Sequence, residues 1–361
     1  MKILVWTAMF AVLLSANSCD RGYSISDSSS GGDTTATTTK YIGPTQGASW
    51  SIVWDKDNAK FTLEKRSKPS ASPSYTVYGT FKELDSGFIE LDFPSSRPSS
   101  ITSSSTAALK LGDHAFVIYP FESGQTQLLY LIVADSCPST DLATAWLSVD
   151  DASDVSSDAV GSYGYLSYSK DDKAINITDS YALDDGNTTQ IASTIDSGSC
   201  TSNVYSAATG DHYFSSAHTL IIENDKTTYQ RKIGFSKTSI NSLTDLSGDG
   251  VGFISNTADP ADTFEISATC NNGSCNIFSE SDINNLHKND NTYNLTIDDN
   301  GRNFPAVGFA VGKLELLGNS TLTNIACIYN TSLVSGKVLL CAASSPDNLT
   351  RLLNITLYFP S

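Results

Sequence analysis

The sequence predicts an all-β protein built from antiparallel β-sandwich or barrel-like domains, and three observations favour this fold class. Apolar residues recur at every second position along most of the chain, as in Trp50, Ile52 and Trp54, which is the period of a strand with one buried face. Clusters of Asp, Ser, Asn and Gly separate these segments at short intervals. The best helix candidate, residues 281–288, is only about two turns long.

The first eighteen residues have the plan of a secretory signal. Lys2 precedes an apolar run from Ile3 to Leu14, and the small residues that follow end at Cys19. An apolar core of about a dozen residues is shorter than the roughly 20 that span a bilayer. We therefore expect residues 1–18 to direct export and to be removed.

The small residues that lead into Cys19 resemble the lipobox of bacterial lipoproteins. This resemblance covers the leader only, and it implies that Cys19 becomes the lipidated first residue of the mature chain. The sequence departs from the family pattern at Ala16, where a lipobox typically has Leu, since Leu13 and Leu14 lie further upstream. The resemblance implies an extracytoplasmic protein of the cell envelope that a lipid holds to the membrane. An ordinary cleaved signal with an incidental cysteine is the alternative.

Residues 19–40 follow as an expected flexible tether. They are rich in Ser, Asp, Gly and Thr and nearly free of apolar residues, so they bury too little surface to offset the entropy lost on ordering. A flexible coil of about 20 residues reaches roughly 25 Å.

Residues 41–238 are expected to form the first β-rich domain. The apolar alternation predicts strands at residues 50–54, 61–63, 75–81, 88–93, 115–121, 128–134, 145–149, 163–168, 174–178, 219–223 and 229–235. The segment 128–134 is apolar at every position, so we expect it to be covered on both faces and to lie centrally. The aromatic residues Trp50, Trp54, Tyr163, Tyr165 and Tyr168 are interpreted as core, with a sugar-stacking platform as the alternative.

Residues 239–361 are expected to form a second β-rich domain, after a Ser, Thr and Asn segment at 236–249. Its predicted strands are residues 263–270, 275–279, 293–297, 307–317, 324–329, 337–343 and 352–359. A single β-propeller is the alternative architecture for the whole chain.

Charge and cysteine content narrow the class of protein further. The formal net charge is -17, which argues against a nucleic-acid partner because phosphate binding needs clustered Lys and Arg. With Cys19 assigned to the lipid, six cysteines remain, and an exported chain meets an oxidising compartment. The turn-forming residues between them favour Cys270 with Cys275 and Cys327 with Cys341 as hairpin bridges, and elimination then pairs Cys137 with Cys200. Zinc is the alternative reading of the cysteines.

One short segment resembles a calcium loop. Asp245, Ser247 and Asp249 alternate before Gly250, as oxygen ligands do in the EF-hand and in some propeller repeats. The pattern departs from the EF-hand at Asn256, which stands where a bidentate Glu is expected. We expect no cofactor, with calcium at Asp245, Ser247 and Asp249 as the possible exception and a plain turn as the alternative.

Enzyme signatures are sparse in this sequence. There is no G-x-S-x-G elbow and no H-E-x-x-H motif, and the histidines, such as His114 and His212, are expected to be exposed at strand ends. We therefore expect a non-enzymatic surface protein with a binding or structural role, whose partner is the membrane together with an unknown protein or carbohydrate. An extracytoplasmic hydrolase with a site assembled from distant strands is one alternative. A secreted eukaryotic glycoprotein is another, supported by N-x-[ST] sequons at Asn176, Asn187, Asn272, Asn294, Asn319, Asn330, Asn348 and Asn354.

Overall fold

The computed structural model contains strands and no helix in the part of the chain that it describes. The described residues are 37–45, 47–125, 127–134, 136–149, 162–182, 194–207, 210–215, 221–225, 231–236, 246–256, 263–279, 292–297, 310–316, 322–330, 336–344 and 352–360. The expected signal, most of the tether and the helix candidate at 281–288 lie outside them. No helix that could cross a membrane occurs among the described residues.

The strands form three closed antiparallel barrels, each an up-and-down barrel of eight consecutive strands. Barrel 1 consists of β1 (Thr38–Thr45), β2 (Ala48–Asp55), β3 (Lys60–Arg66), β4 (Pro73–Glu83), β5 (Ile89–Asp92), β6 (Ser105–Leu111), β7 (Ala115–Ile118) and β8 (Leu129–Val133). It closes because β1 pairs with β8, so neither strand leaves an open edge.

Barrels 2 and 3 repeat this plan. Barrel 2 consists of β9 (Leu142–Ser148), β10 (Ser162–Ser169), β11 (Ala174–Ala182), β12 (Thr194–Thr201), β13 (Val204–Ala207), β14 (Gly210–Phe214), β15 (Ile221–Asp225) and β16 (Arg231–Ser236). Barrel 3 consists of β17 (Gly248–Asn256), β18 (Thr263–Asn271), β19 (Ser274–Ser279), β20 (Thr292–Ile297), β21 (Ala310–Leu316), β22 (Leu322–Asn330), β23 (Gly336–Ser344) and β24 (Leu352–Pro360).

The expectation of an all-β protein is therefore confirmed, and the structure divides the strands among three barrels. The range 41–238 contains two closed barrels, and the expected boundary at 236–249 falls between β16 and β17. One boundary needs correction, because β1 takes in residues 38–40, which had been assigned to the tether. These residues pair with residues 53–55 of β2, and the β-branched Thr38 and Thr39 suit a strand.

The all-apolar segment that contains β8 is covered on both faces, as the sequence predicts. Leu129 and Leu131 belong to the interior cluster of barrel 1. Leu128, Tyr130 and Ile132 point the opposite way and belong to a cluster that all three barrels share. The alternating side chains of this strand thus pack into two cores, which explains why the segment is apolar at every position.

The interiors of the barrels are packed with large apolar side chains. In barrel 1 Trp54 stacks on Phe81 with ring centroids 3.4 Å apart, and Trp50 meets Phe121 edge to face. The aromatic residues named in the sequence analysis are all buried, so they are core residues. Two disulfides, Cys270–Cys275 and Cys327–Cys341, form part of the buried cluster of barrel 3.

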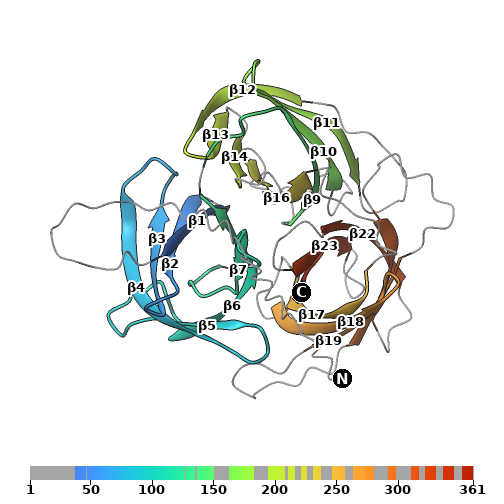
Figure 1. The fold of residues 1–361 in the computed structure, drawn as a ribbon, viewed down its shortest axis with the longest axis horizontal. Helices are drawn as coiled ribbons and strands as arrows, with labels where there is room; N and C mark the ends of the chain where they lie inside the picture. The colour runs from blue at the N-terminus through green and yellow to red at the C-terminus, as the bar shows by residue number, and fades with distance from the viewer. Residues whose placement is uncertain are drawn as a thin grey trace, which may run out of the picture.

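The three barrels lie at the corners of a triangle around the shared cluster (Figure 1). The first and last strands of barrel 1 pack on β14 and β15 of barrel 2, and the first and last strands of barrel 2 pack on β22 and β23 of barrel 3. Barrels 3 and 1 meet through Phe253 and Phe88, whose rings lie 5.2 Å apart, and through a 2.9 Å hydrogen bond between the hydroxyls of Tyr130 and Thr356. One buried cluster therefore holds the molecule together.

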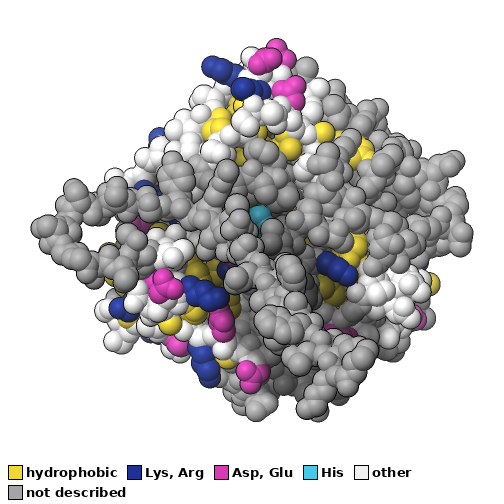
Figure 2. Space-filling model, in the orientation of Figure 1, with side chains coloured by type: hydrophobic (Ala, Val, Ile, Leu, Met, Phe, Trp, Pro, Cys, Tyr) yellow, Lys and Arg dark blue, Asp and Glu magenta, His cyan; other side chains and the backbone are white. Residues whose placement is uncertain are grey.

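Charged side chains are distributed over the outer surface. On the face shown in Figure 2, Lys and Arg side chains lie among Asp and Glu side chains along the described part of barrel 1. Lys65 pairs with Glu122, and Lys110 pairs with Asp113. The Lys110–Asp113 pair, whose Asp113 carboxylate is exposed, stabilises the protein by only about 0–1 kcal/mol.

Candidate binding cleft between the first two barrels

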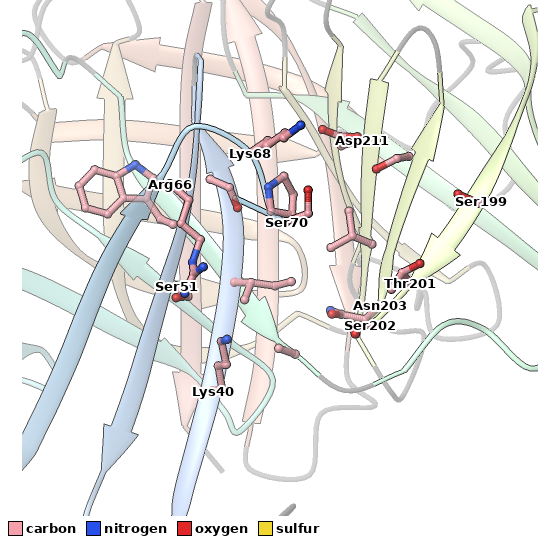
Figure 3. Close-up of a pocket in the computed structure, with 17 residues that line it drawn as sticks. Lys40, Ser51, Arg66, Lys68, Ser70, Ser199, Thr201, Ser202, Asn203 and Asp211 are labelled. Carbon is pink, nitrogen blue, oxygen red and sulfur yellow. The ribbon is translucent and has the colours of Figure 1, made fainter. Parts of the chain in front are cut away.

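A cleft of about 780 Å³ lies where barrel 1 meets barrel 2. Its volume is within the range of about 300–1,000 Å³ that is typical of ligand sites. Figure 3 shows residues of β1, β2 and the β3–β4 loop on one side and residues of β12, β13 and β14 on the other. Because each side belongs to a closed barrel, the two walls are held by separate scaffolds.

The wall from barrel 1 carries the positive charge. Trp50 and Ile52 point into the barrel, so the alternate residues Ser49 and Ser51 face outward toward the cleft, together with Lys40 and Ile42 on β1. Arg66 ends β3, and Lys68 follows in the loop before β4. The Arg66 guanidinium is held by the Glu64 carboxylate and by the carbonyl oxygen of Ala71.

The wall from barrel 2 carries a row of side-chain oxygens. Ser199 on β12, Ser206 on β13 and Asp211 on β14 are successive cross-strand neighbours, and all three line the cleft. Cross-strand neighbours point to the same face of a sheet. The row therefore presents two hydroxyls and one carboxylate to the cations on the opposite wall.

The turn between β12 and β13 joins the two walls. Ser202 and Asn203 both have positive φ, 47° and 64°, which is the conformation of a two-residue hairpin turn. Asn203 is buried, and its amide donates to the carbonyl oxygen of Val133 in barrel 1 and to that of Phe214 in barrel 2. Because Asn tolerates this backbone region better than most residues, the chain can place a bridging amide at this point.

Two further contacts fix the separation of the walls. The Arg231 guanidinium, fully buried on β16, donates to the carbonyl oxygens of Pro44 and Leu128 at 3.2 and 2.9 Å. The Tyr213 hydroxyl donates to the Ser49 hydroxyl at 3.3 Å, and burial raises the pKa of Tyr213 well above its ordinary value, so this phenol stays protonated. Both contacts join barrel 2 to barrel 1.

The buried Asp, Glu, His, Arg and Lys side chains of the described residues gather on β14 and β16 of barrel 2. They are Asp211, His212, Arg231 and Lys232. Asp211 and Arg231 are in register with Asn224 on β15, whereas His212 and Lys232 are in register with Glu223. Within barrel 2 the Lys232 ammonium lies 4.8 Å from the Trp146 ring centroid. These two strands thus place charge on both sides of the barrel wall.

The prediction that the histidines are exposed is wrong for His212. Only 1% of its surface is exposed, and its ring lies 5.9 Å from that of Tyr205. The physical reason is that β14 pairs with strands on both sides in a closed barrel, and His212 packs against Tyr205 of the interior cluster of that barrel. His114 is partly buried, and burial lowers its pKa. His218 lies outside the described residues.

The three disulfides have the pairing expected from the sequence. Cys137, in the link between β8 and β9, joins Cys200 on β12, and the two hairpin bridges form across β18–β19 and β22–β23. Asn272 and Gly273 make the turn beside Cys275 with positive φ. None of the six cysteines lines the cleft.

The remaining predicted sites are not brought together. Cys19 and Asp245 lie outside the described residues. The Ser247 hydroxyl accepts from the backbone N–H of Asn272, and the Asp249 carboxylate accepts from the Thr269 hydroxyl. Across the described ranges, no three His, Cys, Asp or Glu side chains converge as metal ligands would. Calcium binding at Asp245, Ser247 and Asp249 stays a prediction.

Sequence reasoning assigned no residue of the cleft as a site residue, although it considered Trp50, which lines the cleft, for a sugar-stacking platform. The sequence places Lys40 in the expected tether and predicts no strand at Asp211. The cleft residues come from β1, β2, β12, β13, β14 and one loop, and nothing in their spacing shows that they meet. The alternation of side chains along a strand could have shown only which of these residues face out of the barrel, as Ser49 and Ser51 do on either side of Trp50.

Comparison with known proteins identifies no family for this chain. No protein-family model and no curated protein matches it. Among solved structures, it is similar to transferrin binding protein B from serogroup B Neisseria meningitidis, with 9% identity, a TM-score of 0.27 and coverage of 87% of this chain and 66% of the other. A mutant of transferrin binding protein B from Haemophilus parasuis Hp5 gives 10% identity, a TM-score of 0.28 and coverage of 90% and 76%. The chain thus spans about two thirds of the length of the first of these proteins. Likeness at these TM-scores carries no argument about function.

Proposed function

We propose that this chain is an exported, lipid-anchored binding protein of the cell envelope, and that the cleft between barrels 1 and 2 is its ligand site. The observation that carries the proposal is the cleft itself, with three cations on one wall and a row of hydroxyl and carboxylate oxygens on the other. Convergent polar groups in a cleft of this volume are the usual features of a binding site.

The leader and the tether support the location. A lipid on Cys19 would hold the chain at a membrane, and several acyl chains anchor a protein more firmly than one. The Ser- and Gly-rich residues that follow would give the barrels a reach of roughly 25 Å from the bilayer. A ligand site at the junction of two barrels suits such an arrangement, since a flexible tether would let the cleft turn toward its ligand.

A hydrolase is less well supported by the described residues of the cleft. A glycosidase needs two carboxyl groups about 5–9.5 Å apart, and the described lining contains one, Asp211. His212 follows Asp211 in the chain, but its side chain points to the opposite face of β14 and packs beside Tyr205. No specific observation therefore favours hydrolysis at this site.

Burial also weighs against the glycoprotein alternative at two of its sequons. Asn330 and Asn354 are 0% and 3% exposed. The Asn354 amide donates to the carbonyl oxygen of Val149 across the junction of barrels 2 and 3. A glycan is bulky and needs an exposed acceptor, so neither residue suits one in the folded protein.

The cleft can be tested without knowing the ligand, by filling it. Thr201→Trp and Ser70→Trp each place an indole in the cleft from an exposed position on opposite walls. Thr80→Trp is the matched control, because Thr80 is exposed on β4 and does not line the cleft. The measurement is binding of the purified chains to a panel of immobilised glycans and peptides. We expect the first two variants to lose binding that Thr80→Trp keeps, and equal binding by all three would refute the site.

A further inference from the structure

We infer that the ligand of the cleft is an acidic sugar, that is, a glycan unit with a carboxylate or sulfate group beside free hydroxyls. This inference rests on the proposed function, since it names the chemical class that the same cleft binds. It follows from how the charges and the neutral oxygens are divided between the two walls.

The charge balance of the cleft is opposite to that of the chain. The whole sequence has 22 basic and 39 acidic residues, whereas the described lining has three basic residues, Lys40, Arg66 and Lys68, and one acidic residue, Asp211. Fixed positive charge in a concave site raises the local concentration of anions, even on an acidic protein, because exposed charges beyond about 8–10 Å are screened.

Two of these cations are available to a ligand. Arg66 is already held by Glu64 and by a backbone carbonyl. Lys40 and Lys68 are exposed, and neither ammonium group forms an ion pair with the residues that the structure describes. Figure 3 shows Lys40 and Lys68 at different heights along the same wall. An extended ligand with a negative group could therefore meet one or both of them.

The opposite wall distinguishes a sugar from a simple anion. Ser199 and Ser206 are exposed and offer hydroxyls that donate and accept, whereas Asp211, which is largely buried, contributes a carboxylate that only accepts. A carboxylate repels phosphate or sulfate, but it accepts hydrogen bonds from sugar hydroxyls, and it has about four acceptor positions for several partners at once. A ligand that satisfies both walls needs a negative group on one side and hydroxyl donors on the other.

The experiment uses the full mature chain and two acidic probes, 3′-sialyllactose and an unsaturated chondroitin sulfate disaccharide. Lactose is the neutral comparison, and inorganic phosphate is the simple anion. Binding is measured by calorimetry at physiological salt, and circular dichroism verifies that each variant is folded. We expect at least one acidic probe to bind more tightly than lactose, and Lys40→Gln or Lys68→Gln to weaken that binding about tenfold. Lys82→Gln, an exposed lysine on β4 outside the cleft, should leave it unchanged.

The sign of the effect of Asp211→Asn separates the two kinds of anion site. If Asp211 accepts sugar hydroxyls, its replacement weakens binding of the acidic sugar; if it only repels the ligand, binding strengthens. Stronger binding in Asp211→Asn, together with competition by inorganic phosphate, would overturn the inference. In another outcome, lactose binds as tightly as the acidic probes and loses this binding in Thr201→Trp. That result would overturn the inference of an acidic sugar, but it would agree with the proposed binding function of the cleft. Failure of both acidic probes to bind would also overturn the inference of an acidic sugar. The panel of immobilised glycans and peptides would then still test whether the cleft binds a ligand.

Discussion

At the scale of single residues, Arg231 shows how the cleft is held open at a fixed width. A guanidinium is costly to bury unless its donors are satisfied, and here they reach backbone carbonyls of barrel 1 from a strand of barrel 2. The Tyr130 ring lies 5.9 Å from the guanidinium carbon and adds a cation–π contact. Arg231 therefore acts as a positioning residue for the cleft, since it touches the scaffold and not the ligand site.

Replacing Arg231 should uncouple the first two barrels. Arg231→Met keeps the apolar stem and removes the donors, which leaves the Pro44 and Leu128 carbonyls unsatisfied, at a cost of about 2–4 kcal/mol. The measurement is urea unfolding followed by tryptophan fluorescence, since Trp50 and Trp54 report on barrel 1 and Trp146 on barrel 2. Lys82→Met, at an exposed position, is the control. A midpoint that matches the control would contradict the assigned role.

His114 should make the protein less stable in mild acid. Burial lowers its pKa from the ordinary value of 6.5, so the folded state binds a proton less readily than the unfolded state. Stability is therefore complete above the unfolded pKa and declines as the pH falls below about 6.5. We expect His114→Gln to remove this part of the decline, which thermal unfolding between pH 7.5 and pH 5 would show. Parallel curves for the two chains would argue against it.

At the scale of elements, strand pairing around β17 depends on a close approach of two backbones. A Cβ added at Gly252 would overlap the carbonyl oxygen of Thr356 on β24, the strand that closes barrel 3 against β17. Only glycine allows this spacing, because it has no side chain to place there.

Gly252→Ala should therefore weaken the pairing of β17 with β24, which closes barrel 3. We expect a loss of about 3 kcal/mol, as in overpacked cores, and faster amide hydrogen exchange in β17 and β24. Gly124→Ala is the comparison, because its added Cβ meets nothing within 4 Å and only its positive φ, 78°, opposes the change, at about 1–2 kcal/mol. Similar losses in the two variants would show that the close approach is unimportant.

The elements also show how far the sequence could predict this structure. Alternation predicted strands within β2 and β3, because burial imposes a period of two on a strand with one covered face. The continuous apolar run predicted that β8 is covered on both faces. It could not distinguish a sandwich from a closed barrel, since both have the same alternation. Strands β12 to β14 were missed because β13 and β14 are short and because Gly, Ser and Asp interrupt the apolar alternation in β12 and β14. Tertiary pairing outweighs this weak local signal.

At the scale of the whole molecule, three barrels share one core, and a cleft lies between two of them. The leader and the tether stay predictions, which rest on local composition alone. The sequence could not predict the cleft, whose walls come from positions more than 150 residues apart, such as Lys40 and Asp211. Folding brings such residues together, and no local pattern records it.

The anchor is the prediction that belongs to this scale. We expect the mature chain to begin at Cys19 with lipid attached, because small residues precede this cysteine and the apolar run is too short to span a membrane. Intact-mass spectrometry of the protein from its native membrane measures this, with Cys19→Ser as the control that should be released. A mature N-terminus at another residue, without lipid, would exclude the anchor.

The crystal structure of the mature chain soaked with 3′-sialyllactose tests the central claim most directly, because it locates the ligand without relying on any variant. We expect the sugar between barrels 1 and 2, with its carboxylate against Lys40 or Lys68 and its hydroxyls against Asp211 and Ser206. Sugar density on another surface, with the cleft empty, would contradict the account.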